Sequence, residues 1–220
     1  MSKALTLEAS DGHTFSAIQA MPASSVKGAV IVLQEIFGVN SYIRSVCERL
    51  AKAGYLATAP ALFDRIERGY ESGYSPDEVA HSRTFIPRFD VDNALRDIQA
   101  VIDHQPKDVP ISILGFCLGG SMAFKAAQNC AELDSAVCYY GGRIPEWAEM
   151  APQCRTLLHF GETDATIPLE QVTPLKNRWP QVPVYCYPAG HGFDCDQRAS
   201  YHASSAQLAW QRTLDFLSGA

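Results

Sequence analysis

The feature that constrains the fold most is the segment GFCLGG at residues 115–120. It follows a short apolar run, 109–114, that we expect to be a buried strand, and it leads into a segment typical of a helix, 121–127. A strand, a sharp turn flanked by glycines and a helix are the context of a nucleophile elbow, G-x-S-x-G, here with Cys117 in place of serine. Gly115 and Gly119 would allow the tight turn that presents this side chain. The alternative is a buried cysteine in a glycine-rich turn.

Length and charge limit the classes of protein that this chain can belong to. Its 220 residues suit one domain, so we expect a single domain over 1–220. No apolar stretch approaches the roughly 20 residues of a membrane helix, and we expect no signal peptide because the first apolar segment is short and ends at Glu8. The net charge of −6 argues against nucleic acid and anionic membranes as partners. We therefore expect a cytoplasmic protein.

The seven cysteines indicate a reducing compartment. Their number is odd, no C-x-x-C motif occurs, and most lie in apolar runs, so we expect no structural disulfide. One alternative is a zinc site formed by Cys186, His191 and Cys195. Zinc sites with such ligands usually have a paired knuckle and a fourth ligand, neither of which is evident, so we expect no metal.

Apolar runs typical of strands alternate with helical patterns along the chain. The expected strands are 5–8, 15–20, 29–33, 55–59, 111–114, 136–140, 156–160 and 182–187. Asp11-Gly12 predicts a hairpin between the first two. The expected helices include 41–53, 91–104 and 201–217, the last with Leu208, Leu214 and Leu217 facing inward. This alternation predicts an α/β fold with a mostly parallel central sheet and helices on both faces.

The segment 64–88 interrupts the alternation. It is rich in glycine, tyrosine and charge, and it contains Pro76 and Pro87. Loops of this length in compact domains are usually lids or binding loops, so we expect a lid-like loop here. The alternative is a loosely structured surface excursion.

A cysteine nucleophile needs a base to accept its proton and a carboxylate to orient that base. In α/β-hydrolases the order along the chain is nucleophile, acid, histidine, each on a loop after a strand. Asp164 and His191 follow two expected strands in this order, which predicts a catalytic triad with Cys117. Glu162 is an alternative for the acid. His159 falls inside a strand, and we expect it to be a hydrogen-bonded core residue.

The anionic oxygen of a tetrahedral intermediate needs N–H donors. The amide of Leu118, directly after the nucleophile, is one expected donor, and the amide of Ile36, after the third strand, is the second. Glu35 stands beside it at the end of an apolar strand, where a carboxylate must find a partner. The alternative for Glu35 is simple exposure at the strand end.

Six short segments form a pattern that runs nearly from end to end of the chain: 11–15 (DGHTF), 34–40 (QEIFGVN), 115–120 (GFCLGG), 139–141 (YYG), 189–193 (AGHGF) and 212–217 (RTLDFL). Together they resemble the dienelactone hydrolase (carboxymethylenebutenolidase) family. The resemblance implies hydrolysis of a small-molecule lactone or ester through a thiol acyl-enzyme, without a cofactor. It also implies that Cys117 is the nucleophile, His191 the base and Asp164 the orienting acid. Glu35 would contact the thiol at rest and help to release the thiolate when substrate arrives.

One position departs from the family's pattern. Members that act on dienelactone bind its carboxylate with two arginines, one in the lid and one four residues after the histidine, where this chain has Cys195. Arg83 is the candidate lid arginine, and Arg198 is a further cation nearby in sequence. The natural substrate therefore stays open, as does the oligomeric state, with a monomer as one possibility. Alternative functions are a non-catalytic or redox-responsive ligand-binding protein that retains the pocket, and an enzyme acting on thioesters or peptides.

Overall fold

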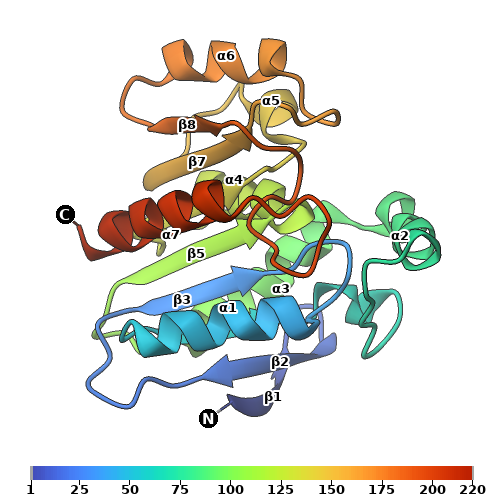
Figure 1. Ribbon diagram of the computed structural model, residues 1–220. Helices are drawn as coiled ribbons and strands as arrows, with labels where there is room; N and C mark the ends of the chain where they lie inside the picture. Colours follow the sequence, from blue (N-terminus) through green and yellow to red (C-terminus); the bar gives the residue numbers. More distant parts are fainter. Residues whose placement is uncertain (1, 220) are drawn as a thin grey trace. The chain divides into compact units, whose positions relative to one another are not determined.

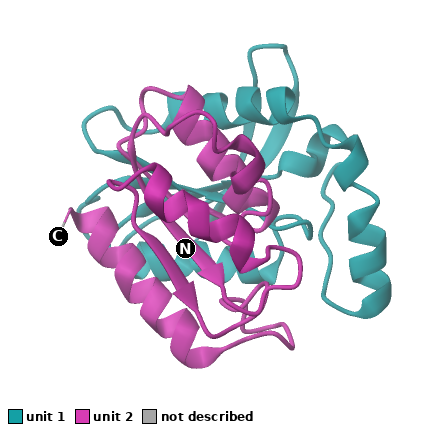
Figure 2. Ribbon diagram, turned by 90° about the horizontal axis from the view of Figure 1, so that it is seen from above, with its two compact units in different colours: residues 1–113 teal, residues 114–220 magenta. Residues whose placement is uncertain are grey.

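In the computed structural model, which describes residues 2–219, strands and helices alternate along the chain as expected. The chain divides into two units, residues 1–113 and 114–220, which Figure 2 shows in different colours. The strand β5 (Ile111–Phe116) crosses the boundary between them. The division does not test the expectation of a single domain, which stays a prediction.

Four strands of the first unit lie in the order β1-β2-β4-β3. They are β1 (Ser2–Glu8), β2 (Thr14–Ala20), β3 (Ala29–Leu33) and β4 (Leu56–Pro60). The hairpin expected at Asp11-Gly12 is confirmed, since β1 and β2 pair antiparallel and Gly12 has a φ of 82°. β2 also pairs antiparallel with β4, whereas β3 and β4 are parallel and completely buried. Full burial of the parallel strands explains their uninterrupted apolar sequences.

Two helices cover the strands of the first unit, α1 in front and α3 behind in the view of Figure 1. α1 (Ser41–Lys52) begins after Asn40, whose side chain accepts a hydrogen bond from the Ile43 amide. α3 (Val91–His104) has the bounds expected from its periodicity and is capped by Asp90. Both helices bury one apolar face, as the sequence pattern indicates.

The segment 64–88 contains regular structure that the sequence analysis did not predict. It includes the second half of η1 (Leu62–Arg65), and all of α2 (Pro76–Arg83) and η2 (Ile86–Arg88). α2 begins with a capping box between Ser75 and Glu78, but buries only Ser82, so it lacks the apolar periodicity that would identify a helix. The alternative of a loosely structured excursion is wrong. Figure 1 shows α2 to the side of this unit's strands, and its role as a lid stays a prediction.

The strands of the second unit lie in the order β5-β6-β7-β8. β6 (Ser135–Tyr139), β7 (Arg155–Gly161) and β8 (Val184–Tyr187) pair in parallel, with Tyr139 opposite His159 and Gly161 opposite Tyr187. The helices of this unit are α4 (Leu118–Asn129), α5 (Ile144–Trp147), α6 (Leu169–Arg178) and α7 (Ala203–Ser218). Carboxyl ends of parallel strands share one edge, so the segments after β7 and β8 emerge side by side.

The inward orientation expected for Leu208 in the last helix is wrong, whereas Leu214 and Leu217 are half-buried. Leu208 in α7 is 46% exposed, and the buried positions are Ser205, Ala206, Ala209 and Thr213. Thr213 is buried because its hydroxyl lies 2.7 Å from the Tyr139 hydroxyl and 3.2 Å from His159 Nε2. A polar contact and two small alanines therefore set the orientation of α7, and hydropathy alone could not indicate it.

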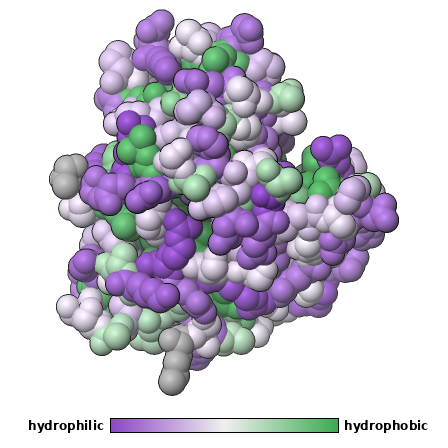
Figure 3. All heavy atoms as spheres, in the orientation of Figure 1, coloured by the Kyte–Doolittle hydropathy of each residue, from purple (hydrophilic) through white to green (hydrophobic). Residues whose placement is uncertain are grey.

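None of the helices formed by residues 2–219 is long and apolar enough to cross a membrane. On the face drawn in Figure 3, hydrophilic residues predominate and the hydrophobic ones form small separate groups. All seven cysteines are free thiols.

Candidate active site

Cys117 occupies the sharp turn between β5 and α4, as the sequence predicts. Its backbone has φ 55° and ψ −113°, a conformation that costs energy in any residue with a Cβ. The Cys117 amide donates to the Tyr139 carbonyl at 3.0 Å, and the Cys117 carbonyl accepts from the Ser121 amide at 3.0 Å. These hydrogen bonds, together with the helix that follows, hold the strained turn in place.

The glycines around Cys117 are required by close backbone packing. A Cβ on Gly115 would lie 1.9 Å from the Gly119 carbonyl oxygen, and a Cβ on Gly120 would lie 2.3 Å from the Tyr139 carbonyl oxygen. Both contacts are far shorter than real Cβ contacts, and the obstructing atoms are backbone. Gly120 thus lets the start of α4 approach the end of β6. Leu118 is the first residue of α4, where amide groups have no acceptor within the helix.

Asp164 and His191 meet after β7 and β8. Oδ2 of Asp164 lies 2.7 Å from Nδ1 of His191. The Asp164 side chain is fully buried and that of His191 is 20% exposed. Glu162, the alternative acid, is exposed, so the geometry favours Asp164 as the partner of His191.

The charged forms of His191 and Asp164 stabilise each other, as the pKa shifts of both groups indicate. Burial lowers the pKa of His191, but its interactions with Cys117 and Asp164, which include hydrogen bonds to both, outweigh this and raise the pKa to about 10. Burial raises the pKa of Asp164, but the hydrogen bonds from His191 and Thr166 hold it below its ordinary value. An imidazolium held between a thiol and a carboxylate is the arrangement that thiol nucleophiles use.

Two further residues at this site were missed by the sequence analysis. Thr166 donates both its amide, at 2.8 Å, and its hydroxyl, at 2.7 Å, to Asp164 Oδ1, and its hydroxyl lies 3.2 Å from His191 Nδ1. The ring of Tyr140 lies 5.1 Å from that of His191, and Tyr140 has a φ of 37°. The position of Thr166 two residues after Asp164 could have indicated a local side-chain turn. No sequence signal pointed to Tyr140 as a contact of His191.

A buried hydrogen-bond network involves β7 and β8, the strands that precede Asp164 and His191. His159 Nδ1 lies 2.8 Å from the Tyr187 hydroxyl, which accepts a hydrogen bond from Arg212. Burial and the positive charge of Arg212 lower the pKa of His159 to about 3, so this imidazole is neutral. Because Arg212 can only donate, the Tyr187 proton is directed to His159, whose other nitrogen faces Thr213. The expectation that His159 is a hydrogen-bonded core residue is confirmed.

The loop after β8 brings one arginine close to His191. Gly192 has a φ of 77°, and a Cβ there would lie 2.4 Å from Nη1 of Arg198, so this guanidinium packs on the backbone next to His191. Cys195 is fully buried. An arginine at position 195 would have to bury its charge or displace the loop.

The other expected site residues belong to the first unit. Glu35 is 1% exposed, and its Oε2 lies 3.3 Å from the Tyr74 hydroxyl, so the alternative of an exposed carboxylate is wrong. Ile36 is buried in the turn after β3. Arg83 is exposed at the end of α2, and its guanidinium makes no hydrogen bond or ion pair with any of residues 2–219. Tyr74 was not predicted, because it lies in the segment whose structure the sequence left open.

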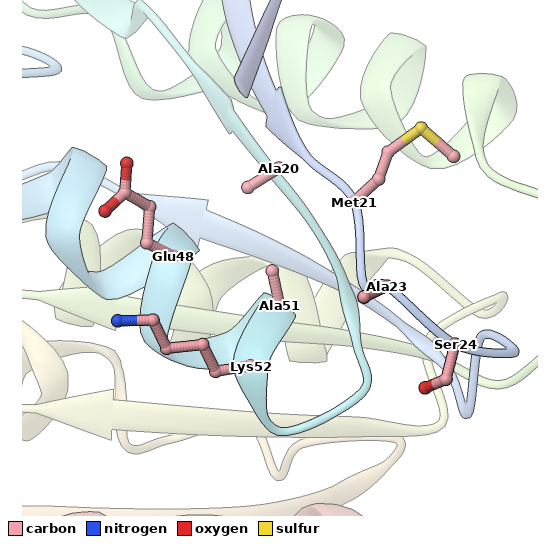
Figure 4. Close-up of a pocket in the computed structure, with 7 residues that line it drawn as sticks. All are labelled: Ala20, Met21, Ala23, Ser24, Glu48, Ala51 and Lys52. Carbon is pink, nitrogen blue, oxygen red and sulfur yellow. The ribbon is translucent and has the colours of Figure 1, made fainter. Parts of the chain in front are cut away.

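The described residues form no metal-binding cluster, and a surface pocket of the first unit does not include the candidate catalytic residues. Among residues 2–219, no group of three or more His, Cys, Asp or Glu side chains is placed to hold a metal ion. A surface pocket of about 530 Å³ lies in the first unit between residues 20–24 and α1 (Figure 4). The pocket is lined by small side chains, by Met21 and by the oppositely charged Glu48 and Lys52. None of the candidate catalytic residues lines it.

Comparison with known proteins places these observations in a family. Residues 15–220 match the model of the dienelactone hydrolase family. Carboxymethylenebutenolidase of Pseudomonas putida is 32% identical and aligns with 99% of this chain and 96% of its own. A Synechocystis protein assigned as a carboxymethylenebutenolidase is 37% identical over 83% of this chain and 82% of its own. The crystal structure of a Klebsiella pneumoniae protein assigned as a dienelactone hydrolase has a TM-score of 0.85 at 29% identity, with both chains covered completely.

The fold class predicted from the sequence is confirmed, because this family has the α/β-hydrolase fold with a mostly parallel sheet. The prediction of an enzyme is confirmed as well, which removes the alternative of a non-catalytic binding protein. The chain belongs to the dienelactone hydrolase family and is a carboxylic ester hydrolase.

Proposed function

We propose that this enzyme hydrolyses small lactones or esters with Cys117 as the nucleophile, through a thiol acyl-enzyme. The observation that supports this most is the position of His191, which is hydrogen-bonded to Asp164 on one side and interacts with Cys117 on the other. Cysteine and histidine in this relationship form a thiolate and an imidazolium. The strained turn at Cys117 is the backbone arrangement of a nucleophile elbow.

The reaction follows from these groups. The Cys117 thiolate attacks the carbonyl carbon, and the tetrahedral oxyanion is stabilised by the amides of Leu118 and Ile36. The carbon–oxygen bond breaks, His191 gives its proton to the leaving alkoxide or enolate, and a thioester to Cys117 remains. His191 then takes a proton from water, whose oxygen attacks the thioester, and the acid and the thiolate are released. Asp164 keeps the imidazole oriented throughout. No cofactor takes part in these steps.

We also propose that Glu35 regulates the thiol, as the resemblance to the family implies. The ionised Glu35 carboxylate would contact the resting Cys117 thiol, and the arrival of substrate would release the thiolate, with the thiol proton passing to His191. We propose a small-molecule lactone or ester substrate as the binding partner of the enzyme. We also propose that the enzyme is cytoplasmic.

The nucleophile is tested by replacing Cys117 with alanine and measuring turnover of a chromogenic ester. The variant should lose activity, while Cys186→Ala, at another partly exposed cysteine, should keep it. Iodoacetamide should inactivate the wild type with one label per chain at Cys117. Full turnover by Cys117→Ala, or inactivation by a label on another cysteine, would exclude the mechanism.

The substrate class depends on which cations face the carboxylate of an acidic lactone. With Cys195 buried, Arg83 and Arg198 are the candidates. Each charge-assisted contact contributes roughly tenfold to a hundredfold in kcat/KM. We propose Arg83 as the substrate ligand, so Arg83→Ala should lower the ratio of kcat/KM for an acid to that for its methyl ester. An unchanged ratio would remove Arg83 from the site and leave Arg198 to be tested in the same way.

A further inference from the structure

Glu35 is a buried carboxylate whose surroundings include a specific donor. It lies two residues after the end of β3, with 1% of its surface exposed. Removing a carboxylate from water is costly unless hydrogen bonds replace the lost hydration. Tyr74, 39 residues further along the chain, brings its hydroxyl to 3.3 Å from Glu35 Oε2.

A second hydrogen bond fixes the direction of this contact. Asn40 Nδ2 lies 3.0 Å from the Tyr74 hydroxyl and 3.0 Å from the Ser72 carbonyl oxygen. An amide nitrogen can only donate, so the Tyr74 oxygen accepts from Asn40 and its single proton is left for Glu35. The orientation of the Asn40 amide is itself determined, because its oxygen caps α1 at the Ile43 amide.

The backbone around Tyr74 is tied to the turn that follows Glu35. The Ser72 amide donates to the Phe37 carbonyl at 3.0 Å, and Gly38 forms a β-bridge with Glu71. The ring of Tyr74 packs edge-on against Phe37, with 4.7 Å between the ring centres. Backbone pairing, ring packing and the Asn40 amide thus hold the Tyr74 hydroxyl in one position. A donor held on a rigid frame can orient a carboxylate, whereas a mobile one would lose that effect to side-chain entropy.

From this arrangement we propose that Tyr74 is a positioning residue for Glu35, which keeps the carboxylate ionised and in one orientation for its action on the thiol. The proposal rests on the proposed role of Glu35. It assigns a function to a residue in the segment 64–88, where the sequence analysis expected a lid-like loop with Arg83 as its only candidate site residue. Tyr74 acts through Glu35, so its contribution should vanish when Glu35 can no longer act.

Replacing Tyr74 with phenylalanine removes the hydroxyl and keeps the ring on Phe37. Loss of one hydrogen bond to a charged group should lower kcat for an ester about tenfold, with KM nearly unchanged. The rate of Cys117 alkylation by iodoacetamide should change its dependence on pH. In a Glu35→Gln background, Tyr74→Phe should have no further effect on either measurement.

The matched control is Tyr70→Phe. Tyr70 lies in the same segment, is buried whereas Tyr74 is half-buried, and has its hydroxyl 2.8 Å from the Ser82 hydroxyl, so the variant removes a tyrosine hydrogen bond away from Glu35. It should affect stability only. The proposal is wrong if Tyr74→Phe and Tyr70→Phe have the same effect on kcat and alkylation, or if Tyr74→Phe is equally harmful with and without Glu35.

A measurement independent of catalysis separates this proposal from the proposed mechanism. The carboxyl carbon of Glu35, followed by NMR, should titrate at a higher pH in Tyr74→Phe than in the wild type, because a donor to the ionised form is lost. If the two titrations coincide, Tyr74 does not position Glu35. Failure of the cysteine mechanism would appear instead as turnover by Cys117→Ala, with the effect of Tyr74→Phe on the Glu35 titration retained.

Discussion

His191 Nδ1 and Asp164 Oδ2 lie 2.7 Å apart although 27 positions separate the two residues in the chain. Parallel pairing of β7 with β8 brings their loops together, and the loops are joined by hydrogen bonds from the Glu162 amide to the Tyr187 carbonyl and from the Thr163 amide to the Ala189 carbonyl. The distance between base and acid is therefore set by the backbone of two adjacent strands.

Asp164→Asn should lower kcat by orders of magnitude. The amide would still fit the site, but it would no longer stabilise the imidazolium or hold the correct tautomer of His191. Glu162→Gln, an equivalent change at an exposed carboxylate two residues away, should have little effect. Steady-state turnover of a chromogenic ester compares the two variants. If their effects are reversed, Glu162 is the acid.

The free energy of unfolding should depend on pH through His191. Its pKa rises from 6.5 to about 10 on folding, so the stabilisation is complete below about pH 6.5 and is lost as the pH rises through 10. Urea unfolding at several pH values should thus show a steeper loss of stability between pH 7 and 10 in the wild type than in His191→Gln. Parallel curves would mean that the His191 charge is not stabilised by the fold.

The free energy of unfolding should depend on Asp164 at acidic pH. Its pKa is lowered on folding from the ordinary value of 3.8, so its stabilisation is complete above that value and is lost as the pH falls through the lower, folded value. Asp164→Asn should therefore flatten the acid limb of the stability profile measured by urea unfolding. If the stability of Asp164→Asn falls at acidic pH as steeply as that of the wild type, the pKa of Asp164 is not lowered by folding.

Backbone strain at Cys117 can be measured with two inactive variants. Cys117→Ala keeps a Cβ at φ 55°, whereas Cys117→Gly removes it. Such conformations cost a residue with a Cβ on the order of 1–3 kcal/mol, and glycine would relieve this strain. The greater flexibility of glycine in the unfolded chain would offset roughly 0.5–1 kcal/mol of the stabilisation. The glycine variant should be more stable by about 1 kcal/mol in denaturant unfolding. Equal stabilities would show that the turn stores no strain.

Gly120 should tolerate no side chain. A Cβ there would lie 2.3 Å from the Tyr139 carbonyl oxygen, whereas the nearest atom to a Cβ on Gly142 is 3.9 Å away. Gly120→Ala should destabilise the protein by about 2–3 kcal/mol and displace the elbow, with loss of activity. Gly142→Ala, the matched control, should behave like the wild type in thermal unfolding and turnover. Normal activity and stability of Gly120→Ala would contradict the close approach of α4 to β6.

Much of the fold could be predicted because the signals are local. The bounds of β3 and α3 agree with the expected ones, since a short uninterrupted apolar run is typical of a buried strand and a period of about 3.6 residues is typical of an amphipathic helix. α2 escaped prediction because it buries almost nothing. The inward orientation of Leu208 in α7 was predicted wrongly because Thr213 is buried instead, with its hydroxyl close to Tyr139 and His159. The α7 contacts join residues that are distant in the chain, and no local pattern contains them.

The sequence by itself determined the fold class and the order Cys117, Asp164, His191, because strand, turn and helix patterns place each of these residues on a loop after a strand. Only the tertiary structure decided that Asp164 rather than Glu162 meets His191, that Thr166 and Tyr140 surround the pair, and that Tyr74 reaches Glu35. Local pattern sets which element a residue belongs to. The distance between two side chains depends on how separate elements pack, and no local pattern contains it.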